Sequence, residues 1–438
     1  MDKRTHGRRA IETGKDILIV LLTCSALWLV SRTQMAGPLR SLFQEETPQA
    51  DTSQAQTEER VSAARPLRIT ASLPGGGRCG AQYDESARDA LFQQVAPLLV
   101  ETMSSAAAPE TITRGQWEEA LTKQTGVCLD FQGEVPLAVL SGWLSGEPGR
   151  LTATVRRLAL SVWEGTAALY YRDERDGGYY RCRSEVVAAS RLESTLTKLA
   201  DNGTFYAFES ELYDALDPDT LLRAELPAMT VYTASSPVTG DQETLEALAE
   251  DLDFSINPNG IYYAGEWVAR SGNDTLRLSE RGVVSYLAEA GGGDHFLVSG
   301  QDGSGGLFDA VERCRQLASA TLGTRCGQAR LYLMSVTETE QGWEIEFGYS
   351  LNGIPVRLET GCAARFLMED GQITQFFLHF RSYTDSGETS AVLPVRQAAA
   401  ALEAMGLEGE ELLLVYTDGG GDALSAGWAA ADRGPGKG

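Results

Sequence analysis

The chain has 438 residues and a formal net charge of −24, from 61 acidic and 37 basic side chains. A chain of this length can form two or three domains with hydrophobic cores of their own. Its acidity excludes recognition of nucleic acid or of an anionic membrane surface by charge, because both would be repelled. The hydrophobic fraction of 43% is typical of a folded protein.

Residues 17–30 form an uninterrupted apolar run, ILIVLLTCSALWLV. A helix extended to residues 11–31 is long enough to cross a hydrocarbon layer of about 30 Å. Five basic residues precede the run and only Arg32 follows it closely, which places the N-terminus in the cytoplasm and the rest of the chain outside. We therefore predict an uncleaved membrane anchor within residues 1–34. A cleaved signal peptide or lipidation at Cys24 fits less well, because no A-x-A site follows and Cys24 lies within the run.

Small side chains cluster inside this predicted anchor, at Thr23-Cys24-Ser25-Ala26. Small residues let two helix backbones approach closely in lipid. The candidates for contact with another helix are Leu22, Thr23, Ser25, Ala26 and Leu29. Ordinary tolerance of small residues in a single-span anchor explains the same cluster without any partner.

Residues 35–65 are polar and show no apolar period, which predicts a flexible tether. A first extracytoplasmic α+β domain is expected at 66–227, beginning with a strand at 67–73 and a helix at 83–103. The glycines at 75–80 match the G-x-G-x-x-G spacing of dinucleotide-binding loops. No second strand ending in an acidic residue follows about twenty positions later, so a plain loop is the preferred interpretation.

Further elements of this domain follow from capping and alternation patterns. Thr113 and Gln116 form a capping-box pattern that predicts a helix over 113–122. Alternating apolar residues predict strands at 127–131, 135–140, 151–163, 167–172, 179–183 and 205–208. A helix is expected at 186–199 and a short helix or turn at 214–225, and Pro227 marks the domain boundary.

Two further α+β domains are predicted at 228–325 and 326–430, with a disordered tail at 431–438. The middle domain combines a strand at 229–233, helices at 244–253 and 307–322, and strands at 260–263, 275–278 and 283–287, with a glycine-rich loop at 291–306. The last domain combines strands at 329–336, 343–351, 354–359, 363–368, 372–383 and 411–416 with a helix at 394–405. Asn352-Gly353 is the strongest hairpin signal in the chain.

An internal repeat links these two domains. LRLSERGVVSY at 276–286 is similar to ARFLMEDGQITQF at 364–376, and each is followed by a helix, a strand and a Gly-Trp pair. This order predicts a duplication. The predicted fold class is α+β: a single transmembrane helix, then extracytoplasmic mixed domains, the last two largely antiparallel sheets packed on helices.

No pattern of residues indicates catalysis. Outside the N-terminal region the histidines are His295 and His379, too few for a triad or a typical zinc site. The nucleophile, zinc and phosphate-loop motifs are absent from the sequence. Six cysteines follow the anchor without a C-x-x-C pair, so disulfides and buried free thiols are both open. We predict no enzyme activity, no cofactor and no metal.

Several stretches resemble the YycH/YycI family of membrane-anchored regulators, which occur beside the WalK sensor kinase of Gram-positive bacteria. They are the anchor at 14–30, RPLRI at 65–69, PLAVLSGWL at 136–144, LRLSERGVVSY at 276–286, FGYSLNGIPV at 347–356, and the strand ending at Trp428. The length is closer to YycH. The resemblance implies a non-enzymatic regulator of cell-wall homeostasis that contacts a WalK-like kinase and a YycI-like partner.

The residues leave a second class of function open. An exported binding module would capture a peptide or a cell-wall fragment on a sheet edge or in a groove between repeats. The two classes differ in their requirement for the anchor, because a regulator needs it for its contacts while a binding module binds its ligand without it.

Overall fold

The computed structural model describes residues 48–257, 259–289, 296–298 and 306–431. The chain divides into two compact units, 1–56 and 57–438, and of the first only residues 48–56 are described. Outside the described residues lie the predicted anchor with Leu22, Thr23, Ser25, Ala26 and Leu29, as well as residues 35–47, His295, most of the 291–306 loop, and the tail after residue 431. No described helix is long and apolar enough to span a membrane.

Within the second unit, the N-terminal lobe is built on an antiparallel sheet of seven described strands in the order β2-β1-β4-β5-β6-β7-β3. Their bounds are β1 Arg68–Ser72, β2 Arg78–Ala81, β3 Glu110–Ile112, β4 Gly126–Pro136, β5 Thr154–Trp163, β6 Thr166–Arg172 and β7 Tyr179–Ala188. Four helices accompany them: α3 Glu85–Ser104, α4 Arg114–Thr122, α5 Leu137–Ser145 and α6 Ala189–Leu196.

Both faces of this sheet are apolar, because helices cover both. Leu129, Leu158 and Leu160 share a core with α3, α5 and α6. Residues of the alternate face, such as Cys128 and Ala159, pack with Trp117 of α4. A short hairpin of β8 (Thr204–Tyr206) and β9 (Leu221–Arg223) follows, and Tyr206 completes the α4 side.

The C-terminal lobe is built on an eleven-stranded sheet, counted over the described residues. Along the sheet the order is β11-β12-β13-β14-β19-β18-β16-β17-β21-β23, with β15 also paired to β16. The bounds are β11 Ile261–Tyr263, β12 Trp267–Ser271, β13 Asp274–Leu278, β14 Val283–Leu287, β15 Arg330–Glu338, β16 Gly342–Leu351, β17 Ile354–Leu358, β18 Ala364–Glu369, β19 Gln372–His379, β21 Leu412–Asp418 and β23 Ala426–Ala430.

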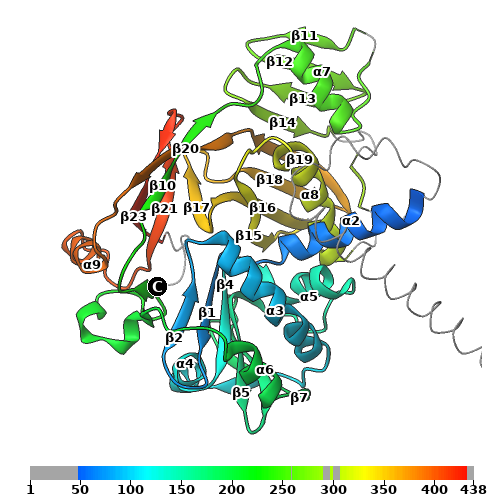
Figure 1. The fold of residues 1–438 in the computed structure, drawn as a ribbon. Helices are drawn as coiled ribbons and strands as arrows, with labels where there is room; N and C mark the ends of the chain where they lie inside the picture. The colour runs from blue at the N-terminus through cyan, green and yellow to red at the C-terminus, as the bar shows by residue number, and fades with distance from the viewer. Residues whose placement is uncertain (1–47, 258, 290–295, 299–305, 432–438) are drawn as a thin grey trace, which may run out of the picture. The chain divides into compact units, whose positions relative to one another are not determined.

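Helices cover one face of this sheet (Figure 1). α7 (Gln242–Asp251) packs on β12 and β13, and α8 (Leu307–Ala318), extended by a π-helical turn at Ser319–Gly323, packs on β16 and β18. α9 (Val395–Ala404) packs on β21. All pairings are antiparallel except that between β17 and β21. The predicted class, mixed α+β with antiparallel sheets on helices, is therefore confirmed.

The two segments predicted to be repeats form neighbouring hairpins of one sheet. One hairpin consists of β13 and β14 and the other of β18 and β19, and the pairing of β14 with β19 joins them. Cross-strand pairing places Leu276, Tyr286, Phe376 and Phe366 in one buried row across the four strands. The two segments thus form adjacent hairpins of one sheet, while their common ancestry stays a prediction.

The domain boundary predicted at residue 325 does not separate two sheets. β14, from the predicted middle domain, pairs with β19 of the predicted last domain. In addition, β10 (Met229–Ser235) forms a small sheet with β20 (Ser382–Ser390) and β22 (Ala423–Leu424). Strand pairing between such distant segments leaves no local signal in the sequence. The predicted boundary therefore separates strands that belong to one sheet.

Three local predictions are wrong. The predicted tether at 35–65 contains the helix α2 (Pro48–Ala63), which lacks an apolar stripe but is tied to α8 by an ion pair between Arg60 and Glu312. The strand predicted at 135–140 ends at Pro136, where α5 begins; α5 is apolar because it is buried. The helix predicted at 186–199 begins only at Ala189, because β7 continues to residue 188.

Other local signals are confirmed. Thr113 and Gln116 make both hydrogen bonds of the capping box at the start of α4. Asn352 and Gly353, both with positive φ, form the turn between β16 and β17. Gly75, Gly76 and Gly77 lie in the turn between β1 and β2, and Gly80 lies within β2, so a strand intervenes before the helix that a dinucleotide loop would need.

Candidate functional site

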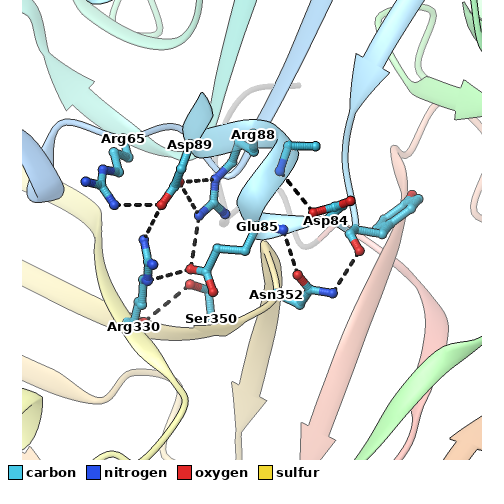
Figure 2. A network of polar contacts seen from close by, with 10 residues as sticks. Arg65, Asp84, Glu85, Arg88, Asp89, Arg330, Ser350 and Asn352 are labelled. Carbon is cyan, nitrogen blue, oxygen red and sulfur yellow. Dashed lines mark hydrogen bonds and ion pairs between the residues drawn. The ribbon is translucent and has the colours of Figure 1, made fainter. Parts of the chain in front are cut away.

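The first turn of α3 carries a network of charges that joins the two lobes, which we call the α3 joint (Figure 2). Glu85 and Asp89 belong to α3, and both pair with Arg330 at the start of β15. Asp89 also accepts hydrogen bonds from Arg65 at 2.7 Å and Arg88 at 2.8 Å. Burial raises the pKa of Asp89, but the hydrogen bonds and charges of Arg88 and Arg330 outweigh it, so the pKa is lowered and the carboxylate stays ionised.

The turn between β16 and β17 reaches the same point. The Asn352 side-chain oxygen accepts a hydrogen bond from the Glu85 backbone amide at 2.7 Å, and its amide donates to the Tyr83 carbonyl at 2.8 Å. The first amides of a helix need such partners from outside the helix. The C-terminal lobe therefore helps to cap a helix of the N-terminal lobe.

A cavity of about 500 Å³ lies beside the α3 joint. Residues from α2, α5, α8, the π-helical turn and β15 line it, so both lobes contribute to its wall. Its apolar lining includes Trp143, Leu331, Leu333 and Phe347, together with smaller side chains such as Ala318 and Ala329. Its charged residues are Glu59, Arg65, Arg315 and Arg330. Volume and mixed lining are those of a small-molecule pocket.

A second set of charges holds the far wall of this cavity. Glu312, in α8, accepts two hydrogen bonds from Arg315 at 2.8 and 3.0 Å and one from Arg60 of α2 at 2.8 Å. Trp143 of α5 donates its indole N–H to the same carboxylate at 3.1 Å. Burial raises the pKa of Glu312, but its hydrogen bonds with Arg315 and Arg60 reverse the effect and lower it. Helices of both lobes thus meet at one ionised carboxylate.

A separate group of charges is almost fully enclosed between the lobes, and we call it the buried charge cluster. Glu411, directly before β21, pairs with Arg68, Arg156 and Arg157 at 2.7–2.8 Å. Asp130 of β4 pairs with Arg68 and Arg157. Burial raises the pKa values of both carboxyl groups, but the surrounding arginines outweigh it and lower both, that of Asp130 well below its ordinary range.

Two glycines allow the backbones of the lobes to approach closely. A Cβ on Gly133 of β4 would lie 2.1 Å from the carbonyl oxygen of Leu333 in β15. A Cβ on Gly142 of α5 would lie 2.3 Å from the ring of Phe308 in α8. Such distances exclude any side chain without a shift of the neighbouring backbone or ring, so both positions need glycine.

His379 and the six cysteines after the predicted anchor lie in ordinary structural positions. His379 ends β19, is half-buried, and lies 2.9 Å from the Thr360 hydroxyl; burial lowers its pKa. Cys79, Cys128, Cys182, Cys314, Cys326 and Cys362 are all free thiols. Burial raises the pKa of Cys128 to about 12, which keeps that thiol protonated at neutral pH. Among the described residues, no group of three or more His, Cys, Asp or Glu side chains could hold a metal ion.

Sequence reasoning missed both charge networks. Glu411 is enclosed by three arginines from the other lobe, and nothing in its own sequence neighbourhood indicates this. One local signal was available, since Arg156 and Arg157 interrupt an apolar strand. The partner that they share, Glu411, lies more than 250 positions further along the chain, and a single sequence does not show that these residues pair.

Comparison with known proteins gives one structural likeness. No family model matches the chain, and no curated protein is significantly similar to it in sequence. The crystal structure of YycH from Bacillus subtilis superposes with a TM-score of 0.52, covering 84% of this chain and 94% of that chain. The fold is YycH-like. Because the sequence identity is 10%, the likeness concerns the fold alone.

Proposed function

We propose that the chain is a membrane-anchored, extracytoplasmic regulator that modulates a WalK-like sensor histidine kinase through protein contacts. It would act beside a YycI-like partner and would have no enzyme activity. The observation that carries the proposal is the YycH-like fold, which extends over 84% of the chain. The resemblance of the sequence to the YycH/YycI family supports the same function.

The joints between the lobes suit such a regulator. A protein that acts by contact must keep distant surfaces in a fixed relation, and charges buried between two lobes contribute to that rigidity. Glu59 and Arg60 of α2 also pair with α8, which ties the end of α2 to the C-terminal lobe.

Membrane reconstitution tests this proposal. The full chain, a WalK-like kinase and a YycI-like protein would be placed in nanodiscs, and kinase autophosphorylation would be measured with and without the chain. We expect the chain to change the rate and to be captured with the kinase by cross-linking from residues 17–30. Unchanged autophosphorylation together with no cross-link would overturn the proposal.

The predicted helix-contact residues allow a matched control. On a helix, Leu22, Ser25, Ala26 and Leu29 share one face and Val20 lies opposite. Ala26→Phe should therefore weaken the cross-link, because it separates the closely packed backbones. Val20→Phe places the same ring on the other face and should leave the cross-link intact. Equal effects of the two substitutions would exclude this contact face.

The exported binding module remains a second candidate because of one feature of the C-terminal lobe. On the β13, β14, β18 and β19 strands, a hollow of about 570 Å³ is lined by residues such as Arg277, Leu287, Arg365 and Phe377. A peptide or a cell-wall fragment could lie across these strands. Saturable binding of muropeptides to a variant with an unrelated membrane span in place of residues 17–30 would favour this candidate over the regulator.

A further inference from the structure

The cavity beside the α3 joint contains arginine N–H groups that are poorly satisfied. The Nε atom of Arg65 is buried, and no hydrogen-bond partner for it exists among the residues that the structure describes. The side chain of Arg315 is 5% exposed, and Glu312 occupies its Nε and Nη2 atoms. Its Nη1 atom reaches Glu59 and Ser319 only at 3.5 Å each, the outer limit of a hydrogen bond. Both arginines line the cavity.

The ion pairs around the cavity contain one more arginine than carboxylates, although each arginine has a carboxylate partner. In the α3 joint, the arginines are Arg65, Arg88 and Arg330, and the carboxylates are Glu85 and Asp89. On the far wall, Arg60 and Arg315 balance Glu59 and Glu312. A buried N–H without a partner is unfavourable, and the carboxylate of a ligand would satisfy it.

The rest of the cavity is suited to an apolar group. Trp143, Leu331 and Phe347 belong to its lining, together with the small side chains of Ala318 and Ala329. Removing an apolar group of a ligand from water contributes about 25 cal/mol per Å² of its surface. The lining also includes the π-helical turn Ser319–Gly323, and such turns are frequent at functional sites.

We infer that this cavity binds a small amphipathic carboxylate. The carboxylate would accept hydrogen bonds from Arg65 and Arg315, and the apolar body would pack against Trp143, Leu331 and Phe347. Trp143 belongs to α5 of the N-terminal lobe and Arg330 to β15 of the C-terminal lobe, so a bound molecule would contact both lobes at once. The inference concerns a ligand of this chain and does not depend on the kinase.

Isothermal titration calorimetry of the full chain in a mild non-ionic detergent tests the inference. The probes are 4-phenylbutyrate and, at equal size, 4-phenylbutan-1-ol and 4-phenylbutylamine. We expect the carboxylate to bind with a stoichiometry of one and the alcohol and the amine to bind at least about tenfold more weakly, because charge-assisted hydrogen bonds are the stronger ones. Equal affinities for carboxylate and alcohol, or no saturable heat from the carboxylate up to about 10 mM, would overturn the inference.

Two substitutions place the binding in this cavity. A Cβ on Gly323 would have only ordinary contacts of 3.7–3.8 Å, so Gly323→Leu should fold and fill part of the cavity. Arg65→Met removes the unsatisfied N–H, while Asp89 keeps its bonds from Arg88 and Arg330. We expect each to weaken 4-phenylbutyrate binding at least about tenfold. Unchanged affinity in both variants would contradict the assignment.

Matched controls separate this effect from general destabilisation. Gly115→Leu adds the same side chain at the start of α4, where a Cβ has only one distant neighbour. Arg114→Met removes an exposed arginine that pairs with Glu118 on the same helix. Both controls should bind 4-phenylbutyrate as the unmodified chain does, and a loss equal to that of the cavity variants would overturn the inference.

Discussion

The α3 joint and the buried charge cluster both connect the two lobes, but their surroundings differ. In the cluster, the C-terminal lobe supplies a carboxylate, Glu411, whose side chain is 2% exposed. In the joint, the C-terminal lobe supplies a guanidinium, Arg330, whose side chain is 41% exposed. Water screens the joint and is excluded from the cluster, so removing one partner should be costly in the cluster and mild in the joint. The cluster therefore fixes the lobes, whereas the joint can adjust beside its cavity.

Loss of Glu411 should have the largest effect. Glu411→Ala leaves three arginines without their shared carboxylate, and we expect the free energy of unfolding to fall by about 3–5 kcal/mol. Urea denaturation of the full chain measures it. The control is Glu119→Ala, which removes an exposed partner of Lys123 and should change stability by less than about 0.5 kcal/mol. A similar small loss for Glu411→Ala would show that the cluster contributes no more than a surface pair.

A fall in pH should have the second-largest effect, because it removes the stability that the buried charge cluster contributes. The pKa values of Asp130 and Glu411 are lowered in the folded chain, so both bind protons more readily when unfolded. Their contribution to stability is present above the ordinary carboxyl pKa of about 4 and is lost as the pH falls further. We expect a decrease of about 2–3 kcal/mol between pH 6 and pH 3 from these two groups. Urea denaturation across this range measures it, and Glu411→Gln should flatten the slope. An unchanged slope in Glu411→Gln would refute the assignment.

Close backbone approach between the lobes can be tested at β4. Gly133→Ala places a Cβ against the Leu333 carbonyl, and we expect a loss of about 1–3 kcal/mol because β15 must shift. Gly115→Ala adds the same methyl group in an open part of α4 and should be neutral or stabilise slightly. Equal stability of the two variants in urea would show that β4 and β15 are not held at this distance.

The contact through Asn352 should contribute the least. Asn352→Gly keeps the positive φ of the turn and removes both hydrogen bonds to the start of α3, so we expect a loss of about 1 kcal/mol. Asp370→Gly is the matched control, because Asp370 is an exposed turn residue with almost the same φ. Thermal unfolding of both variants measures the difference. Identical melting temperatures of the two variants would show that the hydrogen bonds of Asn352 do not stabilise the α3 joint.

The sequence predicted what depends on neighbouring residues. The capping box at Thr113, the hairpin at Asn352 and the amphipathic helix α7 are all local patterns, and all three are present. The same reasoning assigned α5 to a strand, because an apolar run buried on all sides has no period that separates helix from strand. The pairing of β14 with β19 and of Arg157 with Glu411 joins distant segments, so neither could be predicted.

The candidate site could not be predicted either, because its residues also come from distant segments. Arg65 was placed at the end of a tether and Arg330 in a strand, and nothing in their neighbourhoods indicates that both meet Asp89. What the sequence did supply was the family resemblance, and the likeness to YycH supports it at the level of the fold.

The central claim is that the charged joints hold the two lobes as one cooperative unit. Native-state hydrogen exchange of the full chain tests it most directly, by comparing amides of β5 in the N-terminal lobe with those of β18 in the C-terminal lobe. We predict one shared free energy of opening for both strands, lowered equally in both by Glu411→Ala. Clearly different free energies of opening for β5 and β18 in the unmodified chain would contradict the claim.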